Sequence, residues 1–156
     1  MHVRLIAVGD RQPPWVDSAF SDYTARLPNN WKFRLDCVAT AQRGKSSGHD
    51  VARQAEGEKI LDALGPSEFV VVLDERGESL TSRELAGKLT DWQMAGRDLA
   101  FIIGGPDGVS YDCAGRADFS LSLSDMTLPH GLARVVFAEQ MYRAWSLTQG
   151  HPYHRD

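Results

Sequence analysis

The chain has 156 residues, 42% of them hydrophobic and 24% charged, with a formal net charge of −4 at pH 7. This size and composition indicate one globular domain, expected to span residues 1–156, and no apolar run approaches the ~20 residues that cross a bilayer. We therefore expect no membrane association. The net negative charge argues against a protein that holds nucleic acid non-specifically through many phosphate contacts, so we expect no DNA partner.

The first half of the chain alternates between strand and helix patterns. Aliphatic residues up to Gly9 indicate a strand, and apolar residues spaced by three and four after Pro13-Pro14 indicate a helix that Pro28 closes. In order, the predicted elements are a strand over 3–8, a helix over 15–27, a strand over 31–38, a polar, basic loop over 41–48 and a helix over 50–64.

The second half continues the alternation. A capping box at Thr81-Ser82-Arg83-Glu84 opens a helix that Gly96 ends. The other predicted elements are buried strands over 69–73 and 99–103, a short strand over 119–121, a loop over 122–129 and a long helix reaching about Thr148. Strands separated by helices predict an α/β fold with a mostly parallel sheet flanked by helices.

Ligands of open α/β sheets bind beyond the carboxyl ends of the strands. Three such ends are prominent, at residues 73–77, 104–108 and 123–128. The glycine loop Gly104-Gly105-Pro106-Asp107-Gly108 lets the backbone approach a ligand, although a plain tight turn remains an alternative. It matches neither the dinucleotide fingerprint nor the P-loop.

The last predicted helix is apolar around most of its circumference, which indicates burial on more than one side. In so small a protein, the second partner is best explained as another subunit in a twofold dimer. Glu139 and Arg143 lie four residues apart on this helix, and a simple surface ion pair is the alternative to a functional role.

The tail after this helix, His151 to Asp156, is rich in groups that bind or titrate, although a frayed end is the alternative. His130 is a further candidate, unless it merely begins the helix. Cys37 and Cys113 lie far apart and belong to no ligand cluster, which indicates reduced thiols of a cytoplasmic protein and no metal site.

Several segments together resemble the RlmH family, small SPOUT-class methyltransferases that act on N3 of a pseudouridine in bacterial 23S rRNA. The segments are GGPDG at 104–108, LSLS at 121–124, TLPH at 127–130, EQMYRAWS at 139–146 and HPYHR at 151–155, with AVG at 7–9 and RGK at 43–45 in support. The resemblance covers essentially the whole chain, and the ordered set is far more specific than any single segment.

The resemblance implies a carboxyl-terminal trefoil knot, a rare exception to the rule that chains do not thread loops. It implies that the knot holds S-adenosylmethionine and that a homodimer shares each active site between subunits. The residues it assigns to cofactor binding are Leu73, Gly104, Gly105, Leu123, Ser124, Asp125, Met126, Thr127 and Leu128. Asp125 and Met126 lie in the more variable middle of their stretch, where side-chain contacts are less certain than backbone contacts.

The resemblance also suggests catalytic roles in the last helix and tail. His154 or Glu139 would remove the N3 proton, Arg143 or Arg155 would stabilise the developing negative charge, and Tyr153 would orient the base. His130 joins this candidate set. An acidic enzyme with a local basic surface around Arg43 and Lys45 would act on the assembled ribosome, where shape positions it, rather than on free RNA.

Three alternatives remain open from the sequence. A knotted methyltransferase for transfer RNA would share the cofactor loops without needing this tail. A non-catalytic ribosome-binding or assembly factor would need no cofactor, and a flavodoxin-like nucleotide binder would carry a phosphate-bearing ligand.

Overall fold

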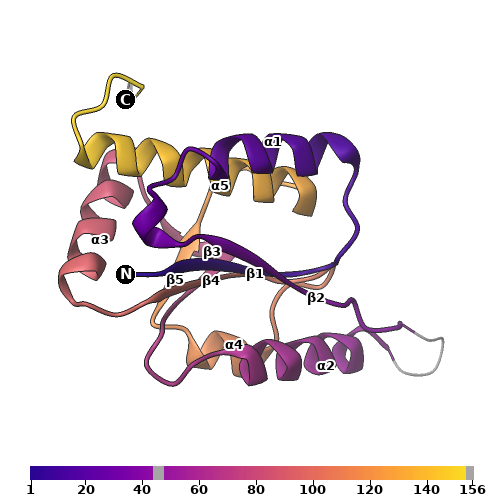
Figure 1. Ribbon diagram of the computed structural model, residues 1–156. Coiled ribbons are helices and arrows are strands. Elements are labelled where there is room, and N and C mark those ends of the chain that lie inside the picture. The colour runs from indigo at the N-terminus through magenta and orange to yellow at the C-terminus, as the bar shows by residue number, and fades with distance from the viewer. Residues whose placement is uncertain (44–47, 154–156) are drawn as a thin grey trace.

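The computed structural model describes residues 1–43 and 48–153, and its centre is a five-stranded sheet (Figure 1). The strand order is β2 (Arg34–Val38), β1 (Val3–Val8), β4 (Leu99–Ile103), β3 (Phe69–Ser79) and β5 (Phe119–Ser122), and every neighbouring pair is parallel. All residues of β1 and β4 are buried, as expected for central parallel strands covered on both faces. The predicted α/β fold with a parallel sheet is therefore confirmed.

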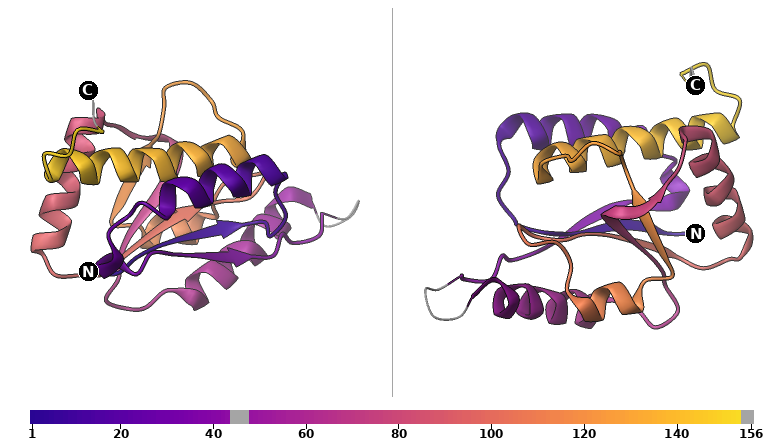
Figure 2. Two further views of the ribbon diagram at one scale, coloured as in Figure 1. Left: turned by 45° about the horizontal axis from the view of Figure 1, so that its top comes forward. Right: turned by 180° about the vertical axis from the view of Figure 1, so that it is seen from behind.

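Helices cover both faces of the sheet. Helices α1 (Pro14–Thr24), α3 (Ser82–Met94) and α5 (His130–Thr148) pack on one face, whereas α2 (Gly48–Ala63) and α4 (Tyr111–Arg116) pack on the other (Figures 1 and 2). Helix α5 contacts both α1 and α3, so it is the centre of its layer. In the described part of the chain, no helix combines the length and apolarity needed to cross a bilayer.

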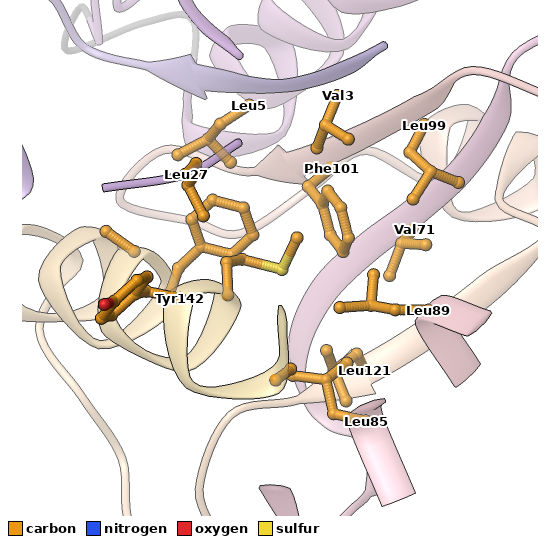
Figure 3. Close-up of a cluster of buried hydrophobic side chains, with 14 of the residues drawn as sticks. Val3, Leu5, Leu27, Val71, Leu85, Leu89, Leu99, Phe101, Leu121 and Tyr142 are labelled. Atoms are coloured by element: carbon orange, nitrogen blue, oxygen red, sulfur yellow. The ribbon is translucent and has the colours of Figure 1, made fainter. Parts of the chain in front are cut away.

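The larger hydrophobic core lies between the sheet and the layer of α1, α3 and α5 (Figure 3). Phe137 of α5 packs on Phe101 of β4 with 5.0 Å between ring centroids, and Trp92 of α3 packs between Phe69 and Phe119. Such aromatic contacts supply large buried areas. They fix α5 above the middle of the sheet, which places its amino end at the carboxyl ends of the strands.

The sequence located most elements correctly, but the start of β2, the end of α1 and the presence of α4 differ from the prediction. The predicted strand over 31–38 is wrong at its start: Asn29–Trp31 forms a 3-10 turn with Trp31 buried, and β2 begins only at Arg34. The left-handed conformation of Lys32 separates the two elements. The first helix also ends at Thr24, before the predicted Leu27, and α4 was not predicted.

Strand β3 differs most from its prediction, because it continues beyond Leu73 to Ser79. Leu73 and Glu78 both pair with Leu121 of β5, so residues 74–77 form an irregularity between two paired segments. At Gly77, a Cβ atom would lie 2.8 Å from the Leu121 backbone, so a side chain has no room there. The extra length exists because β5 supplies a second pairing partner, which no local pattern reveals.

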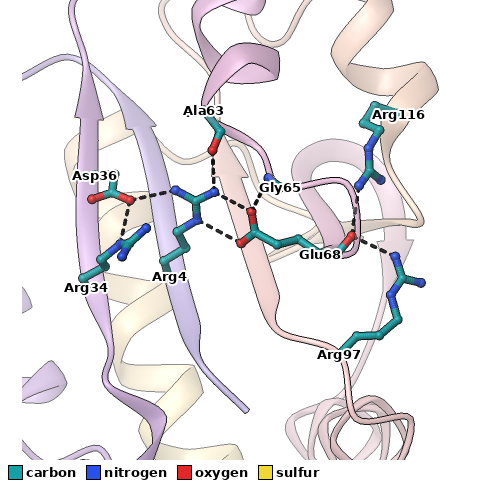
Figure 4. A network of polar contacts seen from close by, with 8 residues as sticks. All are labelled: Arg4, Arg34, Asp36, Ala63, Gly65, Glu68, Arg97 and Arg116. Atoms are coloured by element: carbon teal, nitrogen blue, oxygen red, sulfur yellow. Dashed lines mark hydrogen bonds and ion pairs between the residues drawn. The ribbon is translucent and has the colours of Figure 1, made fainter.

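A network of charges lies at the amino-terminal ends of the strands (Figure 4). Arg4 of β1 bonds Glu68, Asp36 and the carbonyl of Ala63, and its side chain is only 11% exposed. Hydrogen bonds raise the pKa of Arg4, with the largest contribution from Glu68. One guanidinium therefore ties two strands and the end of α2 together, far from the strand ends where ligands bind.

Candidate active site

A cavity of about 610 Å³ opens at the carboxyl ends of β3, β4 and β5. This is the position at which open α/β sheets bind ligands, and the volume is in the range of small-molecule sites. Its walls come from three loops and two helices. The lining residues are Arg53, Leu73, Asp74, Glu75, Arg76, Ile103, Gly104, Gly105, Pro106, Asp107, Gly108, Val109, Ser122, Leu123, Ser124, Met126, Thr127, Leu128, Pro129, His130 and Ala133.

The structure brings together nearly all residues that the sequence assigned to cofactor binding. Leu73, Gly104, Gly105, Leu123, Ser124, Met126, Thr127 and Leu128 all line this cavity. Asp125 does not line it, because its carboxylate turns away to accept a hydrogen bond of 2.7 Å from Ser79 Oγ. These placements leave the functional roles themselves as predictions.

Several lining residues were not singled out individually from the sequence. Asp74, Glu75 and Arg76 line the cavity and lie at the irregularity of β3. Their position just after a buried strand was a usable signal. Arg53 comes from α2, and nothing in its local sequence distinguishes it from an ordinary surface arginine.

The glycine loop forms the floor of the cavity as a tight turn. The Gly108 amide donates to the Gly105 carbonyl at 3.0 Å, and Gly108 has φ +79°, a conformation that favours glycine. A Cβ atom on Gly104 would lie 2.5 Å from the carbonyl carbon of Gly108. The loop can therefore close only with glycine at position 104, and three of its five lining residues carry no side chain.

His130, the first residue of α5, is engaged through both ring nitrogens. Nδ1 lies 3.0 Å from the Gly104 carbonyl, and Nε2 accepts a hydrogen bond of 2.9 Å from Arg134 Nε. Nδ1 therefore carries the proton and donates it to Gly104. Burial, and next the charge of Arg134, lower the pKa of His130, so the ring is neutral at pH 7.

Arg134 is a fully buried arginine, 2% exposed, on the first turns of α5. Besides His130, it donates to the Gly9 carbonyl at the end of β1. The chain Gly9–Arg134–His130–Gly104 therefore connects the ends of β1 and β4 through α5. This arrangement orients the pocket wall and leaves His130 no free lone pair to act as a base.

A second cluster of predicted residues lies on the carboxyl-terminal half of α5. Glu139 Oε1 accepts hydrogen bonds from Arg143 Nη2 at 2.6 Å and from the Tyr153 hydroxyl at 2.9 Å, while Oε2 accepts from Gln140. The Arg143 guanidinium lies 5.2 Å from the centre of the Tyr153 ring. The tail up to Tyr153 is thus packed on α5, and Glu139–Arg143 belongs to a larger cluster than an isolated ion pair.

The electrostatics of this cluster define the protonation of its members. Burial, followed by the bond to Glu139, raises the pKa of Tyr153 to about 12, so its hydroxyl remains a proton donor at neutral pH. The hydrogen bond to Glu139 is the main cause that raises the pKa of Arg143. The cluster therefore presents a permanent cation and a neutral phenol.

Within one chain, the two sites are separate. Along α5, Glu139 lies about 14 Å and Arg143 about 20 Å from His130, given the rise of an α-helix. The tail leaves the far end of α5, away from the amino end that borders the cavity (Figure 1). The predicted residues His154 and Arg155, like Lys45, lie outside the described residues.

Among residues 1–43 and 48–153, no group of three His, Cys, Asp or Glu side chains could hold a metal ion. Cys37 and Cys113 are both free thiols, the first exposed and the second buried.

Comparisons with known proteins identify the relatives of this chain. A family model described as "Predicted SPOUT methyltransferase" matches residues 1–154. Proteins called ribosomal RNA large subunit methyltransferase H are 48% identical in Thioalkalivibrio sulfidiphilus, 46% in Methylibium petroleiphilum and 42% in Hahella chejuensis, and each alignment covers 100% of both chains.

Solved structures are similar in fold at low sequence identity. A methylase family protein from Neisseria gonorrhoeae superposes with a TM-score of 0.60 at 15% identity, covering 99% of this chain and 86% of that one. One from Haemophilus influenzae gives 0.54 at 12% identity, covering 99% and 70%. By full-length sequence similarity, the chain belongs to the SPOUT methyltransferases and, within them, to the family of ribosomal RNA large subunit methyltransferase H.

Proposed function

We propose that this protein is an S-adenosylmethionine-dependent methyltransferase that modifies N3 of a pseudouridine in 23S rRNA. The observation that carries the proposal is the cavity at the carboxyl ends of β3, β4 and β5, which gathers eight of the residues assigned to the cofactor. The curated relatives, named as methyltransferases of large-subunit ribosomal RNA, support the choice of substrate.

The lining of the cavity fits the proposed methyl donor. Leu73, Leu123 and Leu128 offer apolar surface for a purine ring, and the bare backbone of the glycine loop offers hydrogen-bonding groups. The lining also carries charges of both signs, among them Asp74, Glu75 and Arg76, which suits a donor that has a sulfonium, an ammonium and a carboxylate group. When bound, the donor supplies an electrophilic methyl group; the protein has to align the acceptor nitrogen with it.

We assign the residues of the second cluster to the RNA base. Both Glu139 oxygens accept hydrogen bonds from protein donors, which favours Glu139 as the group that orients Arg143 and Tyr153. Arg143 would stabilise the negative charge that develops on the base, and Tyr153 would orient the ring. Proton removal then falls to His154, with Arg155 beside it as a second cation, and His130 positions Gly104 instead of acting as a base.

The separation of the two clusters supports a homodimer with a composite active site. Residues of one chain about 14–20 Å from the cavity along a rigid helix cannot reach a donor bound there. The same cluster from a second subunit can do so. The outward face of α5 also carries apolar groups, among them Leu132 at 38% exposed, as expected for a helix with a second burial partner.

We further infer that the whole chain is one domain with the trefoil knot of the family. After β5 at the edge of the sheet, the chain forms part of the cavity wall and returns over the sheet as α5. A net charge of −4 makes free RNA a poor ligand, so the assembled ribosome in the cytoplasm is the proposed substrate.

The test is transfer of labelled methyl from S-adenosylmethionine to ribosomes of a strain that lacks this gene, with isolated subunits and transfer RNA as alternative acceptors. We expect label at a pseudouridine of the large-subunit RNA in assembled ribosomes. Label in transfer RNA would favour the other knotted methyltransferases. Ribosome association without donor binding would favour an assembly factor. Preference for a phosphate-bearing ligand would favour a nucleotide binder.

A further inference from the structure

Glu56, in the middle of α2, is a carboxylate at a position where an apolar side chain would be expected. Its residue is only 2% exposed, and burying a carboxylate is unfavourable unless it is paired. It accepts hydrogen bonds from the Ala41 amide at 2.9 Å and from Arg43 Nη1 at 2.8 Å. The buried charge of Glu56 is therefore balanced by Arg43 and bonded to the backbone of the neighbouring loop.

The glycine loop of the cavity rests directly on Glu56. A Cβ atom on Gly105 would lie 2.9 Å from Glu56 Oε1 and 3.0 Å from Val8 Cγ1. The Gly105 backbone therefore sits against the carboxylate with no space for a side chain. Glu56 therefore packs against a loop that lines the cavity.

Arg43 connects Glu56 to the other end of the same loop. Its Nε donates to Asp107 Oδ2 at 2.9 Å, while both Nη atoms face the Glu56 carboxylate. The bond to Glu56 is the main cause that raises the pKa of Arg43, and the bond from Arg43 is the main cause that lowers the pKa of Asp107. The Arg43 guanidinium thus binds the loop at Asp107, and the Glu56 carboxylate packs against the same loop at Gly105.

We propose that Arg43 and Glu56 are positioning residues that hold the Gly104–Gly108 loop in the shape that receives the methyl donor. This inference rests on the proposed function and adds a determinant of donor affinity outside the lining of the cavity. Lysine cannot replace Arg43, because its single ammonium does not offer the planar set of donors that spans both carboxylates.

The test measures binding of S-adenosylmethionine and S-adenosylhomocysteine by calorimetry to the unmodified protein and to Arg43→Lys and Glu56→Gln. We expect each substitution to raise the Kd for both ligands about tenfold, which is the effect of losing one charged hydrogen bond. The KM for the donor should rise by a similar factor, while the kcat at saturating donor stays near that of the unmodified enzyme.

Arg4→Lys is the matched control, since Arg4 is also a largely buried arginine that bridges two carboxylates, but at the amino-terminal ends of the strands (Figure 4). It should lower the unfolding midpoint and leave donor affinity unchanged. Equal loss of affinity in Arg4→Lys would show a general effect of instability and overturn the inference.

Asp107→Asn, at a more exposed position, provides a variant that keeps the fold even if the buried pair is sensitive. It should weaken donor binding, and Arg43→Lys added to it should have less than its full effect, because the two residues share one interaction. If Arg43→Lys, Glu56→Gln and Asp107→Asn all fold and bind the donor as tightly as the unmodified protein, this inference is overturned and the proposed function is not. Failure of the unmodified protein to bind either ligand would overturn the proposed function with it.

Discussion

At the scale of single residues, His130 shows how the structure changes the meaning of a sequence motif. A histidine after a proline at the start of a helix is a reasonable candidate for acid–base chemistry. In the fold, its two ring nitrogens form hydrogen bonds with Gly104 and Arg134, and these bonds require the neutral ring. The residue therefore links pH to the stability of the site.

The lowered pKa of His130 predicts a loss of stability in mild acid. In the unfolded chain His130 would bind a proton as the pH falls through about 6.5, whereas the folded state resists protonation to lower pH. The stabilisation is complete above pH 6.5 and is lost as the pH falls toward the folded pKa, at a slope of at most about 1.4 kcal/mol per pH unit.

Urea unfolding between pH 7.5 and 5.5 measures this effect. His130→Asn keeps a donor for the Gly104 carbonyl without titrating in this range, so its free energy of unfolding should fall less than that of the unmodified protein. His2→Asn, at an exposed position, should behave like the unmodified protein. Identical slopes in all three proteins would mean that His130 does not contribute.

At the scale of elements, the glycine loop is the part of the pocket most sensitive to a single added atom. Gly104→Ala places a methyl group 2.5 Å from the Gly108 backbone, and that neighbour is fixed by its own turn. We expect a loss of about 1–3 kcal/mol in stability and at least about tenfold weaker donor binding, because the loop must move.

Gly87→Ala is the natural comparison, since Gly87 is exposed on α3 and a Cβ atom there meets nothing within 4 Å. This change should stabilise the protein by about 0.5–1 kcal/mol and leave donor binding unchanged. Thermal unfolding and calorimetry on both variants check the pair. Normal donor binding by Gly104→Ala would show that the loop does not form the binding floor.

Local patterns were sufficient for much of the fold. The buried runs at 69–73 and 99–103 identified central parallel strands, and the capping box identified α3, where Thr81 accepts from the Glu84 amide. Patterns failed where pairing or packing over long distances decides the outcome. The extension of β3 depends on β5, and the burial of Trp31 overrides the alternation of its neighbours.

The candidate site divides in the same way. Loops at strand ends could be predicted from the sequence, because topology brings them together. Glu56 and Arg134 could not, because a charged residue on a helix is usually solvated and only the fold shows that these two are buried. Such residues support the pocket from behind, where sequence patterns give little signal.

At the scale of the whole molecule, α5 connects the pocket to the tail cluster and sets the distance between them. Its amino end closes the cavity through His130, and its carboxyl end holds Tyr153 against Glu139. Under the proposed dimer, each subunit would contribute a complete pocket to one site and a complete tail cluster to the other.

This spacing has a genetic consequence: two impaired forms of the protein should rescue each other at a donor concentration too low for Gly104→Ala to bind. Chains lacking residues 151–156 keep the pocket, and chains with Gly104→Ala keep the tail, so random pairing yields hybrid dimers with one intact site. Methyl transfer by the co-expressed mixture should reach about a quarter of the unmodified rate, since half the dimers are hybrids with one of two sites working. An inactive mixture would assign both halves of each site to a single chain.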